Sequence, residues 1–285
     1  MIHQLDMQGL DKVDKAIDRF KAYEPPEGYY LCFSGGKDSV VIKALADMAG
    51  VKYDAHYNVT GIDPPELVQF IRQVHSDVVF DIPHYKDGKR ITMWNLIPKK
   101  KMPPTQIARY CCQHLKESGG QGRFVVTGVR WAESTKRKNN RHLAEIHWGG
   151  GARVYSTDNT EDASMFKFCK QNHKRVLNPI IDWSDAEIWE FIKEYNVPYC
   201  ELYDKGQKRL GCIGCPMNTR QKEELERYPK FKALYLKAFE ELIKVLDDES
   251  KHTTWHTAED VMRWWLKEDA EMSKTIITEE LFDEQ

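Results

Sequence analysis

Two groups of residues in this sequence have the types and the spacing that site chemistry requires. The first is the stretch FSGGKDS at Phe33–Ser39, where two glycines, a lysine and two serines follow a short apolar run. The second is a set of cysteines, in which Cys111 and Cys112 are adjacent while Cys212 and Cys215 form a CxxC. The first group suits an anion, and the second indicates metal or redox chemistry.

The FSGGKDS stretch is expected to bind a phosphate or pyrophosphate. Because glycine has no Cβ, the backbone N–H groups around Gly35 and Gly36 can approach an anion closely. The helix expected to follow adds unpaired donors and a partial positive charge. Ser34 and Ser39 can donate hydroxyl hydrogen bonds, and Lys37 supplies a point charge. The glycine spacing matches neither G-x-x-x-x-G-K-[ST] nor G-x-G-x-x-G, so the turn is a different phosphate loop.

The cysteines indicate a metal centre more than a disulfide framework, since disulfides are rare in reducing compartments. Four thiolates from the two distant pairs could enclose zinc or an iron–sulfur cluster. Adjacent cysteines are awkward ligands for one tetrahedral zinc but can serve different irons of a cluster. Cys200 could replace one member of the tandem pair, and that alternative stays open. Cys32 and Cys169 are expected to be incidental or small buried side chains.

Composition limits the class of protein. The chain has 285 residues with 41% hydrophobic and 11% aromatic residues, enough for a sizeable core. No apolar run approaches a membrane span, and the N-terminus has no apolar signal-peptide core. We therefore expect a cytoplasmic protein without a membrane partner, and we further expect a homo-oligomer. The formal net charge of −2 means that any nucleic-acid binding needs a local basic patch. The runs TKRKNNR and PKKK would form one only if they converge.

The elements that must position these groups read as alternating strands and helices. Buried strands are expected at 28–34, 51–59, 77–83 and 123–129, with helices at 38–49 and 64–75 between the first three. An earlier helix is expected around residues 10–20. Strands alternating with helices imply βαβ units. We therefore expect an α/β fold, a doubly wound parallel sheet with a helical C-terminal extension.

The remaining sequence predicts two domains. A nucleotide-binding domain is expected at 1–217, with a mobile polar insertion near 135–173, and a helical extension at 218–285. Residues 99–122 read as irregular and basic. Capping boxes predict helix starts at Ser184, with Glu187, and at Thr257, with Asp260. The C-terminal helical pattern is interrupted near Pro229.

The phosphate turn resembles the pyrophosphate loop of the N-type ATP pyrophosphatase superfamily. That superfamily has a doubly wound parallel sheet and binds adenine nucleotides at the carboxyl ends of the strands. The resemblance implies that the phosphates lie among one continuous set of residues: Ser34, Gly35, Gly36, Lys37, Asp38 and Ser39.

The cysteine pattern beside SGGKDS is similar to that of iron–sulfur members of the phosphoadenosine phosphosulfate (PAPS) reductase family. The segments VTGIDPPEL, TGVRWAESTKR and NPIIDWSDAEIWEFI with LYDKGQKRLGC also fit, so the resemblance covers residues 28–217. It implies a 4Fe–4S cluster on the four paired cysteines. It also implies Thr60 and Gly61 beside the nucleotide, and Gly128, Arg130 and Arg137 on the loop that faces the substrate phosphate or sulfate. The planar fork of Arg130 suits bidentate anion contact.

One departure from the family directs the functional hypothesis. Sulfonucleotide reductases carry a nucleophilic cysteine in an E-C-G-[LI]-H tail, whereas this sequence has no cysteine after Cys215. The resemblance then implies an ATP pyrophosphatase in which Lys37, Asp38 and Arg130 act at the phosphates with Mg²⁺. A partner such as a cysteine desulfurase would deliver sulfur to the activated acceptor, which in such relatives is a nucleic acid, as in DNA phosphorothioation.

Two other functions remain open from sequence. One is a PAPS or APS reductase whose nucleophile comes from another chain or from Cys200. The other is a non-catalytic protein that senses a nucleotide or the redox state.

Overall fold

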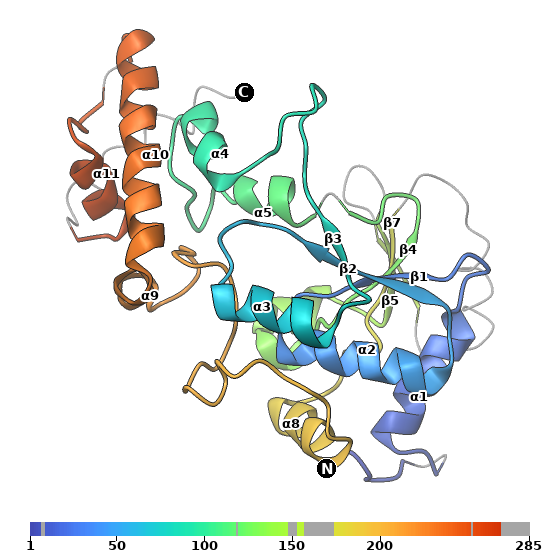
Figure 1. The fold of residues 1–285 in the computed structure, drawn as a ribbon. Helices are drawn as coiled ribbons and strands as arrows, with labels where there is room; N and C mark the ends of the chain where they lie inside the picture. The colour runs from blue at the N-terminus through green and yellow to red at the C-terminus, as the bar shows by residue number, and fades with distance from the viewer. Residues whose placement is uncertain (7–8, 118, 148–152, 157–173, 252, 269–285) are drawn as a thin grey trace. The chain divides into compact units, whose positions relative to one another are not determined.

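The computed structural model describes residues 1–285 except 7–8, 118, 148–152, 157–173, 252 and 269–285, so Cys169 lies outside the described residues. The chain forms two compact units, each built from separated segments (Figure 1). The first unit comprises Met1–Asn58, Pro65–Asp81 and Gly119–Leu210, and the second comprises Val59–Pro64, Ile82–Ser118 and Gly211–Gln285. The sequence predicts two domains divided at a single position, 1–217 and 218–285. Each observed unit instead combines several separated segments, so this domain division stays a prediction.

The first unit contains a sheet of seven strands in the order β3-β2-β1-β4-β7-β5-β6. Strands β3, β2, β1, β4 and β7 are parallel to one another, while β5 pairs antiparallel with both β7 and β6. The expected doubly wound parallel sheet is confirmed, with two antiparallel strands added at one edge. The strands are β1 Tyr29–Cys32, β2 Tyr53–Asn58, β3 Val79–Asp81, β4 Phe124–Val126, β5 Ala144–His147, β6 Arg153–Ser156 and β7 Lys174–Leu177.

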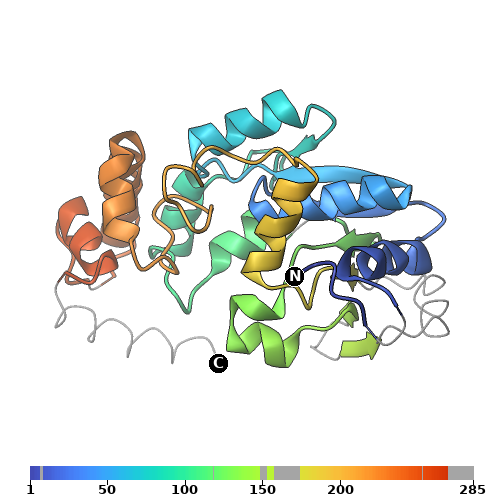
Figure 2. The same ribbon diagram turned by 90° about the horizontal axis from the view of Figure 1, so that it is seen from below.

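The helices of the first unit pack on this sheet: α1 lies beside α2, and α2 lies beside α8 (Figure 2). Helix α2 ends where Gly50 adopts a left-handed conformation with φ 67°, as the sequence predicted. The predicted capping box of Ser184 and Glu187 is present at the start of α8. The helices are α1 Lys12–Tyr23, α2 Lys37–Ala49, α3 Pro65–Val74, the 3-10 helix η1 Trp131–Glu133, α6 Thr135–Asn140 and α8 Asp185–Glu194.

Two stretches expected to be irregular contain regular structure. The expected loop at 135–173 includes α6, β5 and β6 in its described part. The sequence around β5 is polar and does not predict a strand. The backbone groups of β5 find their hydrogen-bond partners in β7. Its buried Glu145 accepts a hydrogen bond from Arg141 Nε at 2.8 Å, so a charged residue is tolerated inside a strand. The expectation of irregularity at 99–122 is likewise wrong for α5 Tyr110–Leu115.

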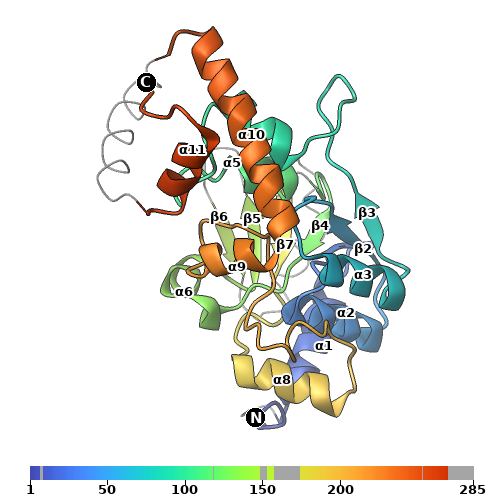
Figure 3. The ribbon, with the colours of Figure 1, turned by 60° about the vertical axis from the view of Figure 1, so that its left-hand side comes forward.

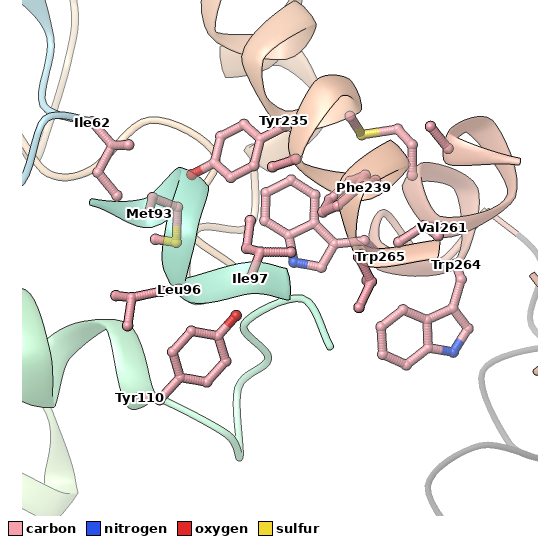
Figure 4. Close-up of a cluster of buried hydrophobic side chains, with 14 of the residues drawn as sticks. Ile62, Met93, Leu96, Ile97, Tyr110, Tyr235, Phe239, Val261, Trp264 and Trp265 are labelled. Atoms are coloured by element: carbon pink, nitrogen blue, oxygen red, sulfur yellow. The ribbon is translucent and has the colours of Figure 1, made fainter. Parts of the chain in front are cut away.

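The second unit is helical and has its own apolar core. Helix α10 packs against α4 and α11 (Figure 3). Figure 4 shows the buried cluster, in which Tyr235 and Phe239 of α10 meet Trp265 of α11. The predicted interruption near Pro229 is confirmed, since this proline occupies the first turn of α10. The helices are α4 Met93–Lys100, α5 Tyr110–Leu115, α9 Gln221–Arg227, α10 Pro229–Asp248 and α11 Ala258–Trp265, the last with its predicted Thr257 capping box.

Among the helices in the described part of the chain, none combines the length and the apolar character needed to cross a membrane.

Candidate functional site

The turn between β1 and α2 has the conformation that its glycines permit. Gly35 has φ +73°, and a Cβ there would lie 2.7 Å from Leu67 Cδ1, so a larger residue would clash with α3. Gly36 is the N-cap of α2. The Ser39 hydroxyl donates to the Gly36 carbonyl at 2.8 Å, and the Lys37 backbone N–H donates to the Tyr203 hydroxyl at 2.8 Å. These contacts hold the turn tightly against the start of α2.

The loop that follows β4 meets this turn. The strand order reverses between β1 and β4, which is where open parallel sheets bind ligands beyond the carboxyl ends of their strands. A Cβ on Gly128 would lie 3.0 Å from the Asp38 Cβ, so glycine allows the close approach. The structure therefore brings Gly128 and the phosphate turn together, as both were expected at this edge of the sheet.

Arg130 has only 1% of its surface exposed and lies in an ionic network at this edge, whose carboxylates remain accessible to solvent. Its Nε donates to Asp38 Oδ1 at 2.7 Å, its Nη2 donates to Asp185 Oδ1 at 2.6 Å, and its Nη1 donates to the Trp183 carbonyl at 3.1 Å. This arrangement differs from an arginine whose fork is held ready for a ligand anion. The guanidinium instead fixes two carboxylates beside the phosphate turn, which favours a positioning role.

Lys37 belongs to the same network. The side chain is 9% exposed, and its Nζ lies 3.3 Å from Asp185 Oδ1 and 3.6 Å from Asp38 Oδ2. The Arg130 and Lys37 cations hold the pKa of Asp185 below its usual range, against the opposing effect of burial. Two cations and two carboxylates thus lie within one connected group at the start of α2.

We expect Arg130→Lys to lower turnover while the protein stays folded. Lysine keeps the charge but cannot bond Asp38, Asp185 and the Trp183 carbonyl together. A lost hydrogen bond to a charged group is worth about 1.5 kcal/mol, so kcat for pyrophosphate release should fall about tenfold. The fall should exceed any change in the affinity for ATP, and Arg123→Lys is the matched control because Arg123 binds Asp54 instead. Unchanged kinetics would return Arg130 to a purely structural role.

Arg137 adds positive charge near the turn. It forms an ion pair with Glu133 one helical turn away. Burial and the neighbouring charges of Arg209 and Arg141 lower the pKa of Arg137 to about 10. The Asp38 carboxylate acts on Arg137 in the opposite direction, which places this arginine within electrostatic reach of the phosphate turn.

Two residues at this site were not singled out from the sequence. Asp185 was noticed only as part of a helix start, and Tyr203 only within the segment LYDKG. Neither residue type carries a local signal for phosphate chemistry. Their roles depend on α8 and the following segment lying beside the turn, a long-range packing that the sequence pattern does not reveal.

The four paired cysteines all belong to the second unit. Trp265 Nε1 donates to the Pro104 carbonyl at 2.7 Å, and Tyr235 donates from its hydroxyl to the Ile213 carbonyl at 2.9 Å. Gly214, between the CxxC cysteines, has φ +72°, and a Cβ there would lie 2.9 Å from the Tyr235 ring. The aromatic core thus anchors the CxxC loop.

The four paired cysteines affect one another electrostatically, and their neighbours shift the pKa values of their thiols. Cys111 donates a hydrogen bond to Cys112, whose Sγ also lies 3.6 Å from Arg109 Nη2. These two contacts outweigh burial and lower the pKa of Cys112, while the same pairing raises the pKa of Cys111. Cys212 and Cys215 are close enough to affect Cys111 electrostatically. Burial raises the pKa of Cys212 to about 12, while Lys116, which donates to its sulfur, opposes this rise.

The cluster itself stays a prediction. In the part of the chain that the structure describes, no group of three or more Cys, His, Asp or Glu side chains is arranged to hold a metal ion. Cys200, the alternative ligand, is fully buried and belongs to the first unit. Cys32 also belongs to the first unit. The two expected cysteine pairs therefore belong to the same unit, and Cys32 and Cys200 belong to the other one.

Thr60 and Gly61 belong to the second unit and form a tight turn there. The Thr60 hydroxyl donates to Asp63 Oδ2 at 2.8 Å and accepts from the Ile62 N–H at 3.1 Å. The Ile62 carbonyl in turn accepts from the Ile213 N–H at 2.7 Å, which joins this turn to the CxxC loop. Thr60 is nearly fully buried, so its hydroxyl serves the turn; its expected contact with a nucleotide stays a prediction.

Comparison with known proteins identifies similar chains. Residues 28–218 match the family model of the phosphoadenosine phosphosulfate reductase domain. The adenosine 5'-phosphosulfate reductase of Allochromatium vinosum is 31% identical over 156 residues, which are 55% of this chain and 55% of that protein. The chain spans about half the length of the curated relatives it matches.

Two solved structures are similar at low sequence identity. The PAPS reductase of Candida auris, in a phosphate complex, has a TM-score of 0.45 at 17% identity and covers 73% of this chain and 96% of its own. The FMN adenylyltransferase of Candida glabrata, with FAD and inorganic pyrophosphate, has a TM-score of 0.46 at 16% identity and covers 75% of this chain and 71% of its own.

Proposed function

Since the chain belongs to the phosphoadenosine phosphosulfate reductase domain family, whose named relatives are enzymes, we propose that it is an ATP pyrophosphatase that activates an acceptor for sulfur transfer. The observation that carries the proposal is the phosphate turn at Gly35–Ser39, which lies at the β1/β4 reversal against the loop of Gly128 and Arg130. Glycine backbone, a helix N-terminus and Lys37 are suited to the phosphates of an adenine nucleotide.

The residues around the turn have distinct roles in this proposal. Lys37 places positive charge on the phosphates, where charge accumulates as the α–β linkage breaks. Arg130 holds Asp38 and Asp185 in place, so that these carboxylates limit where the Lys37 ammonium can lie. An acceptor oxygen attacks the α-phosphorus, and pyrophosphate leaves with the electron pair of the broken bond. Sulfur at the oxidation level of sulfide then attacks the acceptor atom that carries the adenylylated oxygen, and AMP leaves with the electron pair of the broken bond. Sulfane sulfur from a persulfide donor reaches that level by taking two electrons from a thiol reductant.

Two bound groups complete the proposal. Mg²⁺ would neutralise the leaving pyrophosphate. A 4Fe–4S cluster on Cys111, Cys112, Cys212 and Cys215 would supply a centre that binds sulfur or relays electrons. The sulfur donor would be a partner such as a cysteine desulfurase, and the acceptor would be a nucleic acid.

The reductase alternative needs an accessible nucleophilic thiol. No cysteine occurs between Cys215 and Gln285. Cys200, the other candidate nucleophile, is fully buried, and burial raises the pKa of its thiol, so its thiolate is both scarce and shielded. These observations favour the pyrophosphatase over a reductase that uses Cys200.

Product analysis separates the three functions. Anaerobic protein incubated with ATP, Mg²⁺, a sulfur donor and an oligonucleotide acceptor should release pyrophosphate and AMP in equal amounts. Sulfite released from PAPS in a thiol-dependent reaction, with no pyrophosphate from ATP, would instead identify a reductase. Binding of ATP without any product under these conditions would identify a sensor.

A further inference from the structure

We infer that a basic patch on the second unit binds the phosphate backbone of a polynucleotide. We define the basic patch by its five exposed cations, which come from the hairpin before α4 and from the last turn of α4: Lys86, Lys89, Arg90, Lys99 and Lys100. The inference locates the surface that would bind the nucleic-acid acceptor of the proposed function, and it rests on that function for its catalytic meaning. The binding itself is a separate property and can be tested without ATP.

The hairpin is an ordered feature. The chain between β3 and α4 turns back on itself, as Figures 1 and 3 show. Tyr85 N–H donates to the Lys89 carbonyl and Ile91 N–H to the Pro83 carbonyl, both at 2.8 Å, and Gly88 supplies the turn with φ +81°. This backbone ladder presents Lys86, Lys89 and Arg90 from a defined scaffold.

The hairpin is tied to α4 through an aromatic ring. Lys99 Nζ lies 3.8 Å from the centre of the Tyr85 ring, and the Tyr85 hydroxyl donates to Asn95 Oδ1 at 3.3 Å. An open hollow of about 550 Å³ lies here, lined by Tyr85, Lys86, Asp87, Lys89, Asn95 and Lys99. Such a hollow can admit one unit of a longer polyanion between the hairpin and the helix.

The basic patch keeps its positive charge among the residues that the structure describes. None of its five cations forms an ion pair with a carboxylate in the described ranges, whereas neighbouring Lys101 binds Glu249. Asp87 is the single acid on the hairpin. A local excess of positive charge on a chain of net charge −2 indicates an anionic partner. The TKRKNNR run belongs to α6 of the first unit and is not counted in this patch.

The arrangement favours a repeating polyanion over other anions. A single phosphate would need donors that converge on one point, whereas these cations are distributed over a hairpin and a helix end. A membrane surface would need a broad exposed apolar face beside the charges. Among the residues of the hairpin and α4, only Ile82 is an exposed large hydrophobic side chain, and Lys99 lies over the Tyr85 ring. Arg90 Nη2 lies 4.0 Å from the position of a Cβ on Gly61, so the patch extends to the turn expected beside the nucleotide.

The test measures binding of fluorescent single-stranded DNA and RNA of about 16 nucleotides, the upper end of common site sizes, to the full chain without ATP. With five cations engaged, the logarithm of the association constant should fall with the logarithm of salt concentration at a slope of about −3.5. The double variant Lys86→Glu with Lys89→Glu should reduce the magnitude of that slope by about 1.4 and weaken binding more than tenfold. The matched control is Lys52→Glu with Lys230→Glu, the same charge change at exposed lysines outside the patch.

The outcomes either support the inference or overturn it. Loss of binding in the patch variant with retention in the control, at equal melting temperatures, supports it, and comparison of DNA with RNA identifies the polynucleotide. Equal binding by both variants overturns it, as does binding of phosphatidylserine vesicles in place of oligonucleotides. Oligonucleotide binding without pyrophosphate release would contradict the proposed function but not this inference. Pyrophosphate release without oligonucleotide binding would contradict this inference but not the pyrophosphatase activity.

Discussion

Replacing Lys37 by methionine is expected to weaken ATP binding about 100-fold, because a hydrogen bond to a charged group contributes up to about 3 kcal/mol. Methionine keeps most of the buried length of the side chain, so the loss reports the charge and not a cavity. The Lys37 backbone N–H keeps its bond to Tyr203, and Arg130 still neutralises Asp38 and Asp185. The first unit should therefore stay folded.

Calorimetry with ATP and Mg²⁺ measures this effect. Lys52→Met is the matched control, since Lys52 is an exposed lysine of the same unit outside the phosphate turn. Equal ATP affinity for the Lys37 variant and the parent, with melting temperatures unchanged, would contradict the prediction that Lys37 binds the nucleotide.

Replacing Cys212 or Cys215 by serine should eliminate iron from protein prepared without oxygen. The parent is expected to be brown and to carry about four irons per chain, as a single 4Fe–4S centre requires. Both cysteines come from the loop that Tyr235 and Gly214 hold on the aromatic core, so the metal would tie that loop to the segment of Cys111 and Cys112. The second unit should therefore lose stability together with its iron.

Matched variants make this result specific. Cys32→Ser should keep full iron, because Cys32 belongs to the first unit. Full iron in Cys111→Ser combined with loss in Cys200→Ser would make Cys200 the fourth ligand. Tight binding of one zinc, with no iron after anaerobic reconstitution, would exclude the cluster and remove its link to sulfur chemistry.

Local sequence was sufficient for the phosphate turn but not for its neighbours. The pattern of a strand, two glycines and a helix determines Gly35–Ser39 within a few residues, and the structure has that strand and that helix. The partners of Arg130 could not be predicted in the same way, because Asp38 and Asp185 are distant from it in sequence. The expectation that Arg130 contacts the substrate anion came from the family resemblance of its loop, its place after a strand and its planar fork, none of which reveals its partners.

The same distinction explains the errors in secondary structure. Strand β5 was missed because it is short and lies within a polar, glycine-broken stretch, and it gains its backbone partners from β7. The basic patch also needed the structure, since Lys99 and Lys100 were visible in the PKKK run whereas the hairpin cations were not grouped with them. Lys101, the last lysine of the PKKK run, forms an ion pair with Glu249. The two residues are far apart in the sequence, so composition cannot reveal this ion pair.

The nucleotide that remains bound through purification tests the central claim most directly. Protein prepared without oxygen can be denatured and its released nucleotides identified by mass spectrometry, with the Lys37→Met variant prepared in parallel. If the chain is an ATP pyrophosphatase, the parent protein should release ATP or AMP, and the Lys37→Met variant should release much less of either nucleotide. PAPS or APS in place of ATP, or equal amounts of adenine nucleotide in both preparations, would contradict it.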